Sequence, residues 1–168
     1  DAKRLWFDNK FGRLNTEEKG EYLGKFEAED RLLVIYTDGN YEILDQELTQ
    51  RFDADKMLLI EKYDPNKIIT AVYLDNDKLQ YNIKRFKIET TTLNSKFLFI
   101  KEGKDNRLEA VSTDESPVLK VQTGRGQQVN KAKFKVDKLV EVMGWKAAGA
   151  KLVDFSKSVE MEWEVKEN

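Results

Sequence analysis

Basic and apolar side chains alternate in residues 131–136, which read KAKFKV. In an extended strand, Lys131, Lys133 and Lys135 would share one face at a spacing of about 6.6 Å, with the intervening apolar residues facing the core. Like charges arranged in this way repel one another, so stability alone gives little reason for the pattern. A DNA duplex, with one phosphate charge per about 1.7 Å of axis, would supply the missing counter-charge. The segment therefore predicts a surface that binds a polyanion.

The loop immediately before this segment has a composition that suits phosphate binding. Residues 123–128 read TGRGQQ, and the two glycines would let backbone N–H groups approach a phosphate beside Arg125. The spacing is that of neither the P-loop nor the dinucleotide-binding motif. A flexible, solvated loop is an equally good interpretation.

Carboxylate pairs are the only other groups that suggest chemistry. Two carboxylates facing each other across a cleft can hydrolyse a glycoside, but Asp and Glu are also common at turns for local reasons. The chain has no His and no Cys, which excludes a Ser-His-Asp triad, a thiolate nucleophile, a Cys/His zinc site and a disulfide within it. We therefore expect a binding or structural module with no catalytic residues and no metal site. The acidic pairs are Glu17 with Glu18, Glu27 with Glu29 and Asp30, Asp53 with Asp55, and Asp75 with Asp77.

Length and composition limit the class of protein that could position these groups. The 168 residues predict a single domain over 1–168, and 40% hydrophobic with 36% charged residues is too apolar for disorder and too charged for a membrane protein. We find no signal or transit peptide and no apolar run approaching 18 residues. The net charge of −2 hides an uneven distribution: −6 over residues 1–66, +7 over 67–153 and −3 over 154–168. This predicts that residues 67–153 form a surface that faces a polyanion and that residues 154–168 form an acidic terminal strand or tail. An ordinary solvated surface is the alternative.

Short strands joined by turns dominate the pattern. Residues 32–36 and 40–43 flank a Thr-Asp-Gly turn, residues 68–74 and 79–83 flank Asp-Asn-Asp, and residues 97–100 and 108–111 flank a turn at 103–106. Helical signals are limited to single turns within residues 45–52 and 138–143. The sequence therefore predicts an all-β protein.

The hairpins recur. Residues 5–9 (LWFDN) resemble residues 72–76 (VYLDN), and turn centres 29 residues apart occur twice, near residues 9 and 38 and near residues 76 and 105. Repeated hairpins favour a radial or stacked β architecture. In one expected strand the apolar residues change from odd positions, up to Ile83, to even positions, from Phe86. This predicts either a β-bulge that turns Lys84 and Arg85 outward or a simple bend.

The last segment also alternates. Residues 159–165 read VEMEWEV, so a final strand would place Met161 and Trp163 on one face and glutamates on the other. An acidic tail is the alternative. We expect the strand, and we expect it to pair with an open edge near the N-terminus.

Several segments resemble one protein family. Residues 30–39 (DRLLVIYTDG) resemble the blade motif of the C-terminal domain of bacterial type IIA DNA topoisomerase A subunits, which are those of DNA gyrase and topoisomerase IV. Residues 3–15 with 20–26 resemble the opening blade of topoisomerase IV-like subunits, and residues 144–152 (GWKAAGAKL) resemble the segment that closes a blade. The likeness covers nearly the whole chain.

The resemblance implies a β-pinwheel of three to four blades with exchanged strands, in a complete or an incomplete ring. Such a domain binds and bends duplex DNA around a basic rim and presents the transport segment to the catalytic core. It carries no catalytic residue and no cofactor, because the cleavage tyrosine, the Mg site and the ATPase lie elsewhere in the ATP-dependent isomerase. The implied partners are double-stranded DNA, the rest of the A subunit and the ATPase B subunit, with no membrane. The implied location is the bacterial cytoplasm, in association with the nucleoid.

One departure from the family bears on which enzyme the chain resembles. Gyrase carries a Gln-Arg-Arg-Gly-Gly-Arg-Gly box in its first blade, whereas residues 15–21 here read NTEEKGE and are acidic. Behaviour like that of topoisomerase IV, without tight chiral wrapping of DNA, is therefore the better expectation.

Besides hydrolysis by a pair of carboxylates, the sequence leaves two functions open. The first is electrostatic binding of duplex phosphates without reading the sequence. The second is a β-propeller-like module for protein–protein interaction. The residues expected to contact DNA are Lys84, Arg85, Lys87, Lys120, Arg125, Lys131, Lys133, Lys135, Lys146 and Lys151.

Overall fold

The computed structural model describes residues 1–166, which form two compact units. The first unit comprises Asp1–Asp64 and Thr90–Leu98, and the second comprises Pro65–Glu89 and Phe99–Asn168. The first contains 11 basic and 16 acidic residues and the second 18 and 15, so the net charges are −5 and +3. The assignment of residues 1–168 to one domain stays a prediction.

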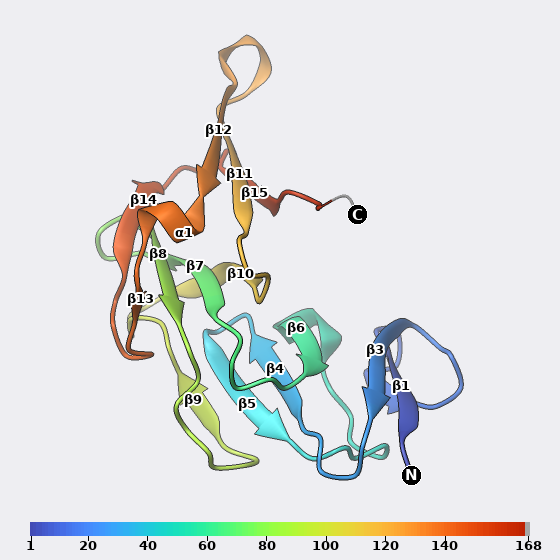
Figure 1. Cartoon of the computed structure of the whole chain (residues 1–168). Helices are drawn as coiled ribbons and strands as arrows, with labels where there is room; N and C mark the ends of the chain where they lie inside the picture. The colour runs from blue at the N-terminus through green and yellow to red at the C-terminus, as the bar shows by residue number, and fades with distance from the viewer. Residues whose placement is uncertain (167–168) are drawn as a thin grey trace. The chain divides into compact units, whose positions relative to one another are not determined.

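The first unit contains two antiparallel sheets (Figure 1). A three-stranded sheet has the order β2-β1-β3, and a four-stranded sheet has the order β6-β4-β5-β9. A single 3₁₀ turn, Ala54–Lys56, precedes β6. The strands are β1 (Lys3–Asp8), β2 (Arg13–Asn15), β3 (Glu21–Phe26), β4 (Leu32–Tyr36), β5 (Asn40–Leu44), β6 (Met57–Lys62) and β9 (Lys96–Leu98).

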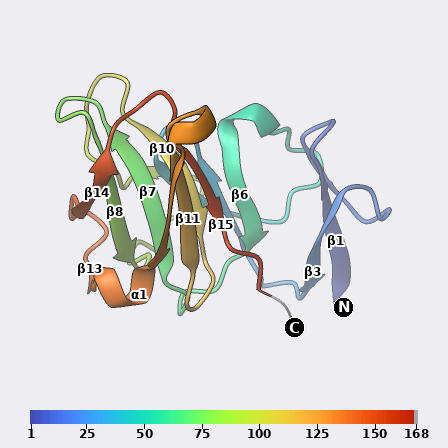
Figure 2. The same cartoon turned by 90° about the horizontal axis from the view of Figure 1, so that it is seen from above.

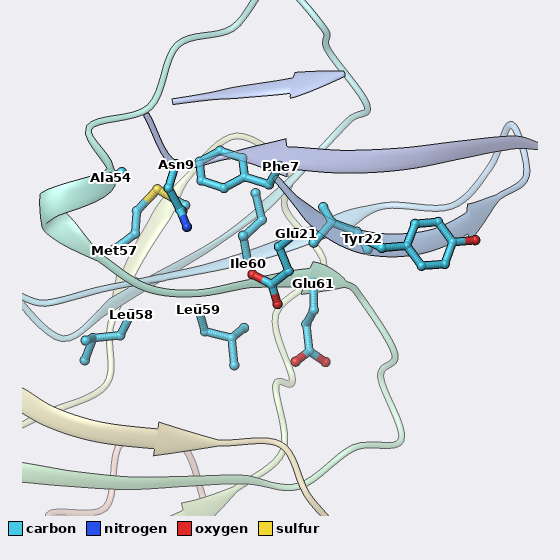
Figure 3. Close-up of a pocket in the computed structure, with 11 residues that line it drawn as sticks. Phe7, Asn9, Glu21, Tyr22, Ala54, Met57, Leu58, Leu59, Ile60 and Glu61 are labelled. Atoms are coloured by element: carbon cyan, nitrogen blue, oxygen red, sulfur yellow. The ribbon is translucent and has the colours of Figure 1, made fainter. Parts of the chain in front are cut away.

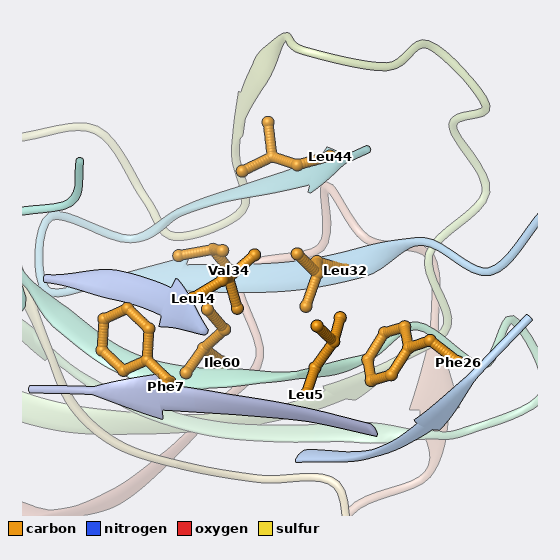
Figure 4. Packing of buried hydrophobic residues seen from close by; sticks show 8 residues of the cluster. All are labelled: Leu5, Phe7, Leu14, Phe26, Leu32, Val34, Leu44 and Ile60. Carbon is orange, nitrogen blue, oxygen red and sulfur yellow. The ribbon is translucent and has the colours of Figure 1, made fainter. Parts of the chain in front are cut away.

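The core of the first unit follows the period of two that the strands impose. Leu5 and Phe7 of β1 point to the same side, where they meet Leu32 and Val34 of β4 and Phe26 of β3 (Figure 4). All five are at most 1% exposed. Burying an aliphatic or aromatic side chain of this size contributes about 1.5–3 kcal/mol, so these contacts are a main source of the unit's stability.

The second unit also contains two sheets (Figures 1 and 2). One has the order β10-β7-β8-β13, with β14 also paired to β8, and the other has the order β12-β11-β15. None of the helices in the described chain is long and apolar enough to cross a membrane. The elements are β7 (Ile69–Asp75), β8 (Gln80–Phe86), β10 (Arg107–Ser112), β11 (Val118–Thr123), a 3₁₀ turn (Gly126–Gln128), β12 (Asn130–Lys135), α1 (Val136–Leu139), β13 (Val142–Met143), β14 (Ala150–Asp154) and β15 (Glu160–Trp163).

Strands β7 and β8 are covered on both faces. All residues of β7 and all but the first of β8 are buried, and the apolar ones include Val72, Leu74 and Ile83. Leu119 and Val121 of β11 belong to the same apolar cluster. Because both faces of these strands are covered, buried and exposed residues do not alternate along them.

The expectation of an all-β chain is confirmed, and so are two of the three hairpins. Strand β4 pairs with β5 across a turn in which Gly39 has a φ of 87°, and β7 pairs with β8. The third hairpin is wrong: β9 pairs with β5, and β10 pairs with β7. The chain does turn at residues 103–106, where the Asn106 N–H donates to the Gly103 carbonyl at 3.2 Å, but the strands flanking this turn join different sheets.

Two sheets are completed by a strand from later in the chain. Strand β9 follows the β7–β8 hairpin in sequence but adds to β5, and β14 follows the β11–β12 hairpin but adds to β8. In both cases the added strand lies beside the second strand of a hairpin. This is the strand exchange that the resemblance implied.

The acidic segment at the end of the sequence contains β15. This strand pairs antiparallel with β11, with Leu119 opposite Trp163 and Val121 opposite Met161. The expected pairing with an edge near the N-terminus is therefore wrong, because β11 lies in the second unit. Residues 167 and 168 lie outside the described part of the chain.

Candidate nucleic-acid interface

The expected lysine pattern lies on β12, at one edge of the sheet β12-β11-β15. Lys131, Lys133 and Lys135 are exposed, and Phe134 between them packs against the apolar cluster of the second unit. Ala132 is exposed instead of buried, so the inner side of β12 is only partly covered. The expectation that three lysines share an outer face is otherwise confirmed.

The neighbouring strands bring further charges to this face. Lys133 lies opposite Lys120 of β11, which in turn lies opposite Glu162 of β15. In the next row Lys131 faces Gln122, which faces Glu160. Four lysines and the glutamates of β15 therefore share one surface, and we call it the lysine face: Lys120, Lys131, Lys133 and Lys135.

Two of the four lysines already have carboxylate partners. The Lys120 ammonium lies 3.1 Å from Glu162, and the Lys133 ammonium donates to Glu164 at 2.9 Å. The hydrogen bond from Lys133 and its positive charge lower the pKa of the Glu164 carboxyl. Within residues 1–166, Lys131 and Lys135 form no ion pair. The lysine face thus combines two neutralised and two free cations.

The glycine loop between β11 and β12 begins with a turn that is fixed at Gly124. Gly124 has a φ of 89°, and a Cβ there would lie 2.1 Å from the Gln128 carbonyl oxygen, so the turn requires glycine. The Gly124 N–H donates to Ser158 Oγ at 3.1 Å and is therefore not available to a phosphate. Arg125 is exposed at the tip. The loop offers this guanidinium to an anion, and of the N–H groups that the composition suggested for a phosphate cradle, that of Gly124 is already used.

Lys84 does not reach the surface. It is 1% exposed, and its ammonium donates to the Trp145 carbonyl at 2.7 Å and to the Phe99 carbonyl. The ring of Phe86 lies 5.0 Å from the same ammonium. Burial lowers the pKa of Lys84 to about 8. This lysine holds two loops against β8 and cannot contact a phosphate.

Arg85 is also inside the second unit. It is 7% exposed, and it donates to the Val140 carbonyl at 3.0 Å. Of the two alternatives for this strand, the β-bulge is absent from the described β7–β8 ladder, which runs without a register shift from Asp75 opposite Gln80 to Ile69 opposite Phe86. The outward orientation expected for both residues is therefore wrong, because both faces of β8 are covered.

The remaining basic candidates are exposed and lie outside β11 and β12. Lys87 follows β8, and Lys146 lies over the Trp145 ring at 5.2 Å. Lys151 of β14 pairs with Asp154 at 2.6 Å. The structure thus brings together four of the ten candidates, places Arg125 on the adjoining loop and removes two from the surface.

Of the acidic pairs, Asp75 has a clear structural role. It is 1% exposed and accepts hydrogen bonds of 3.2 Å from the Lys78 N–H and the Lys101 ammonium. Burial alone would raise the pKa of Asp75, but these two donors outweigh it and lower the pKa overall. Asp75 therefore fixes the β7–β8 turn. Among the described residues, no group of three or more acidic side chains is placed to hold a metal ion.

One hollow in the first unit contains a different pair of carboxylates. It has a volume of about 390 Å³, and Phe7, Met57 and Ile60 contribute apolar side chains to it (Figure 3). Glu21 of β3 and Glu61 of β6 also line it. The acidic pairs expected from the sequence do not contribute. Two carboxylates would repel a phosphate, so this hollow is a poor candidate for binding DNA.

Comparison with known proteins supplies two findings. Residues 13–160 match the sequence profile of the topoisomerase C-terminal domain of the Bacteroidota. The fold matches a solved structure, the C-terminal domain of DNA topoisomerase IV, with a TM-score of 0.67 at 11% sequence identity. This match covers 99% of the present chain and 62% of that one. A search of curated protein sequences gave no match. The fold of residues 1–166, with its four sheets, thus matches the β-pinwheel of a topoisomerase C-terminal domain.

Proposed function

Because the chain belongs to the family of topoisomerase C-terminal domains of the Bacteroidota, we propose that it is the part of a type IIA topoisomerase A subunit that binds duplex DNA. The domain performs no bond chemistry itself and needs no cofactor. It holds and bends the transport segment for the ATP-dependent reaction of the rest of the A subunit and the ATPase B subunit, in the bacterial nucleoid. The acidic sequence of residues 15–21 favours topoisomerase IV over gyrase.

The observation that supports DNA binding most directly is the lysine face of the positively charged second unit. Lys131 and Lys135 project from one face of an exposed strand, and no carboxylate of the described chain neutralises them. Arg125 extends the same positive region into the loop before β12. Such a surface attracts phosphates and releases their counterions, and it reads no base.

The test is the salt dependence of binding to a short duplex. We expect Lys131→Gln with Lys135→Gln to weaken binding on every sequence and to reduce the slope of log affinity against log salt by about 1.8, which is about 0.9 for each lost contact. A fluorescent duplex titrated between low and moderate salt measures both quantities. Lys133 is left unchanged because it already pairs with Glu164.

The matched control is Lys3→Gln with Lys25→Gln, which removes the same charge from exposed positions of the first unit. We expect its slope to equal that of the unchanged protein. Equal loss in both double variants would show that net charge alone determines affinity, and would contradict the assignment of the lysine face. No binding to DNA at low salt would contradict the proposed function itself.

Bending without tight wrapping is a separate expectation. When a nicked plasmid is ligated with the domain bound, a chirally wrapped duplex changes the linking number, whereas a planar bend does not. Since residues 15–21 carry acidic side chains where gyrase has a basic box, we expect little change in linking number. A large shift of constant sign would favour wrapping like that of gyrase.

A further inference from the structure

A second hollow of the first unit lies where the segment between β5 and β6 meets the β1–β2 turn. The Phe52 N–H of that segment donates to the Gly12 carbonyl of the turn at 2.8 Å. Gly12 has a φ of 66°, and a Cβ there would overlap the Phe52 carbonyl oxygen, so this close approach requires glycine. The hollow has a volume of about 340 Å³, which is within the range of sites that hold a small ligand.

Two guanidinium groups line this hollow from different parts of the chain. Arg13 directly follows Gly12, and Arg51 directly precedes Phe52. The backbone contact between Gly12 and Phe52 therefore holds the segments of both arginines side by side. Both arginines are exposed, and within residues 1–166 neither forms an ion pair. Because like charges repel, stability alone gives little reason to bring them together.

The carboxylates that line the same hollow are already engaged. Glu17 lies 3.1 Å from the Lys19 ammonium. Asp8 lies opposite Arg13 in the β1–β2 ladder, and its Oδ1 accepts the Lys10 N–H at 2.9 Å. The two guanidinium groups are thus the charges of this hollow that lack a partner in the described chain. Their planar geometry matches that of a phosphate.

The apolar side of the hollow is unusually exposed. Phe11 of the β1–β2 turn is 60% exposed and Leu48 is 38% exposed, and neither belongs to the core cluster of the first unit. The Lys10 ammonium lies 5.6 Å from the centre of the Phe11 ring and adds a cation beside it. An exposed aromatic ring next to arginines is the combination that binds an unpaired base together with its phosphate.

Stacking decides which kind of nucleic acid can use this hollow. In a duplex the faces of the bases are covered by the neighbouring pairs, so the Phe11 ring cannot stack on them without unstacking. We propose that the hollow binds an unpaired nucleotide of a single strand, with the phosphate on Arg13 and Arg51 and the base against Phe11. This interaction goes beyond the proposed duplex binding, which uses the lysine face of the second unit and reads no base.

The experiment measures binding of a fluorescent thymidine strand of about ten nucleotides, a length typical of single-strand sites. It uses the Lys131→Gln, Lys135→Gln protein as background, because this change removes the free cations of the lysine face. Phe11→Leu keeps an apolar side chain but removes the ring, and we expect it to bind the strand about tenfold more weakly with an unchanged salt slope. Arg13→Gln with Arg51→Gln should instead reduce the slope of log affinity against log salt by about 1.4, which is about 0.7 for each lost contact.

The matched control is Tyr22→Leu, which removes a ring of similar exposure, 51%, from the first unit but outside this hollow. We expect it to bind the strand as the background protein does. A strand with 5-iodouracil at its centre gives a second readout that needs no substitution: on irradiation of the unchanged protein it should crosslink to Phe11, as identified by mass spectrometry.

Three results would overturn the proposal. The first is equal affinity of Phe11→Leu and Tyr22→Leu for the strand, and the second is crosslinking that does not involve Phe11. The third is binding of thymidine monophosphate as tight as that of the strand, which would make a free nucleotide the occupant. With the lysine face intact, Phe11→Leu should bind duplex as the unchanged protein does, so failure of single-strand binding is distinguishable from failure of duplex binding.

Discussion

Replacing Glu162 and Glu164 together by glutamine should raise the affinity for duplex DNA roughly tenfold or more near 0.1 M salt. These carboxylates lie 3.1 Å from the Lys120 ammonium and 2.9 Å from the Lys133 ammonium. In the unchanged protein a phosphate must therefore compete with them for two of the four lysines. The double variant frees both cations and also removes two negative charges beside the duplex.

The slope of log affinity against log salt should become steeper by about 1.8, since two lysines become available to phosphates. Stability should change little, because both ion pairs are exposed and such pairs contribute little. Glutamine keeps the shape of glutamate, so β15 should stay paired with β11. Any gain in affinity then reports on charge and not on rearrangement of the sheet.

The control is Glu27→Gln with Glu29→Gln, which makes the same charge change at exposed sites in the first unit. We expect this variant to bind DNA nearly as the unchanged protein does. If both double variants bind more tightly by the same factor, the lysine face has no special role. If neither does, phosphates do not reach Lys120 and Lys133.

The alternation of residues in the sequence was sufficient to predict β12, because β12 is an edge strand whose side chains are mostly exposed. An edge strand exposed on one face shows its lysines at a period of two, and nothing in the rest of the chain has to be known. The same is true of the β4–β5 turn, where Gly39 adopts a positive φ that few other residues tolerate. The resemblance to the topoisomerase family, which rests on the order of several weak motifs, led to the correct fold.

The errors concern features that depend on distant parts of the chain. Lys84 and Arg85 are two adjacent cations, so the local sequence alone places them at the surface. In the structure, β8 pairs with β7, β13 and β14, and the side chains on both of its faces are buried. Likewise β9 has three residues, and no local signal selects β5, about 50 residues upstream, over the strand that follows the next turn. The alternation in β15 predicts outward-facing glutamates, yet only the pairing with β11 reveals that they neutralise lysines.

A second large effect should appear in the pH dependence of stability, which Lys84 controls in the alkaline range. Burial lowers the pKa of Lys84 to about 8, whereas the unfolded chain has the ordinary value of 10.5. Between these two values the unfolded state binds more protons than the folded state, so stability rises with pH. From pH 8 to pH 9, below the range in which tyrosines of the unfolded chain ionise, we expect an increase of about 1 kcal/mol in the free energy of unfolding.

Lys84→Met should abolish this increase, because methionine fills a similar space and carries no titratable group. The carbonyls of Phe99 and Trp145 lose their donor in the variant, but that cost does not change with pH. The difference between two pH values therefore isolates the amine. Measurements should stop near pH 9, because burial raises the pKa of Tyr36, Tyr63, Tyr73 and Tyr81 above the ordinary value of 10.0. As the pH approaches 10, these tyrosines ionise in the unfolded chain first, which lowers stability.

Urea denaturation at half-unit steps from pH 7 to 9 gives the required curves. The control is Lys87→Met, because Lys87 is exposed three residues along the same segment. The control should keep the alkaline increase. If Lys84→Met keeps it as well, the amine of Lys84 is charged and solvated in the folded protein, and its side chain does not point into the interior from β8. If the increase is lost only in Lys84→Met, the Lys84 amine is buried in the folded protein, and this residue is not part of a surface that contacts phosphates.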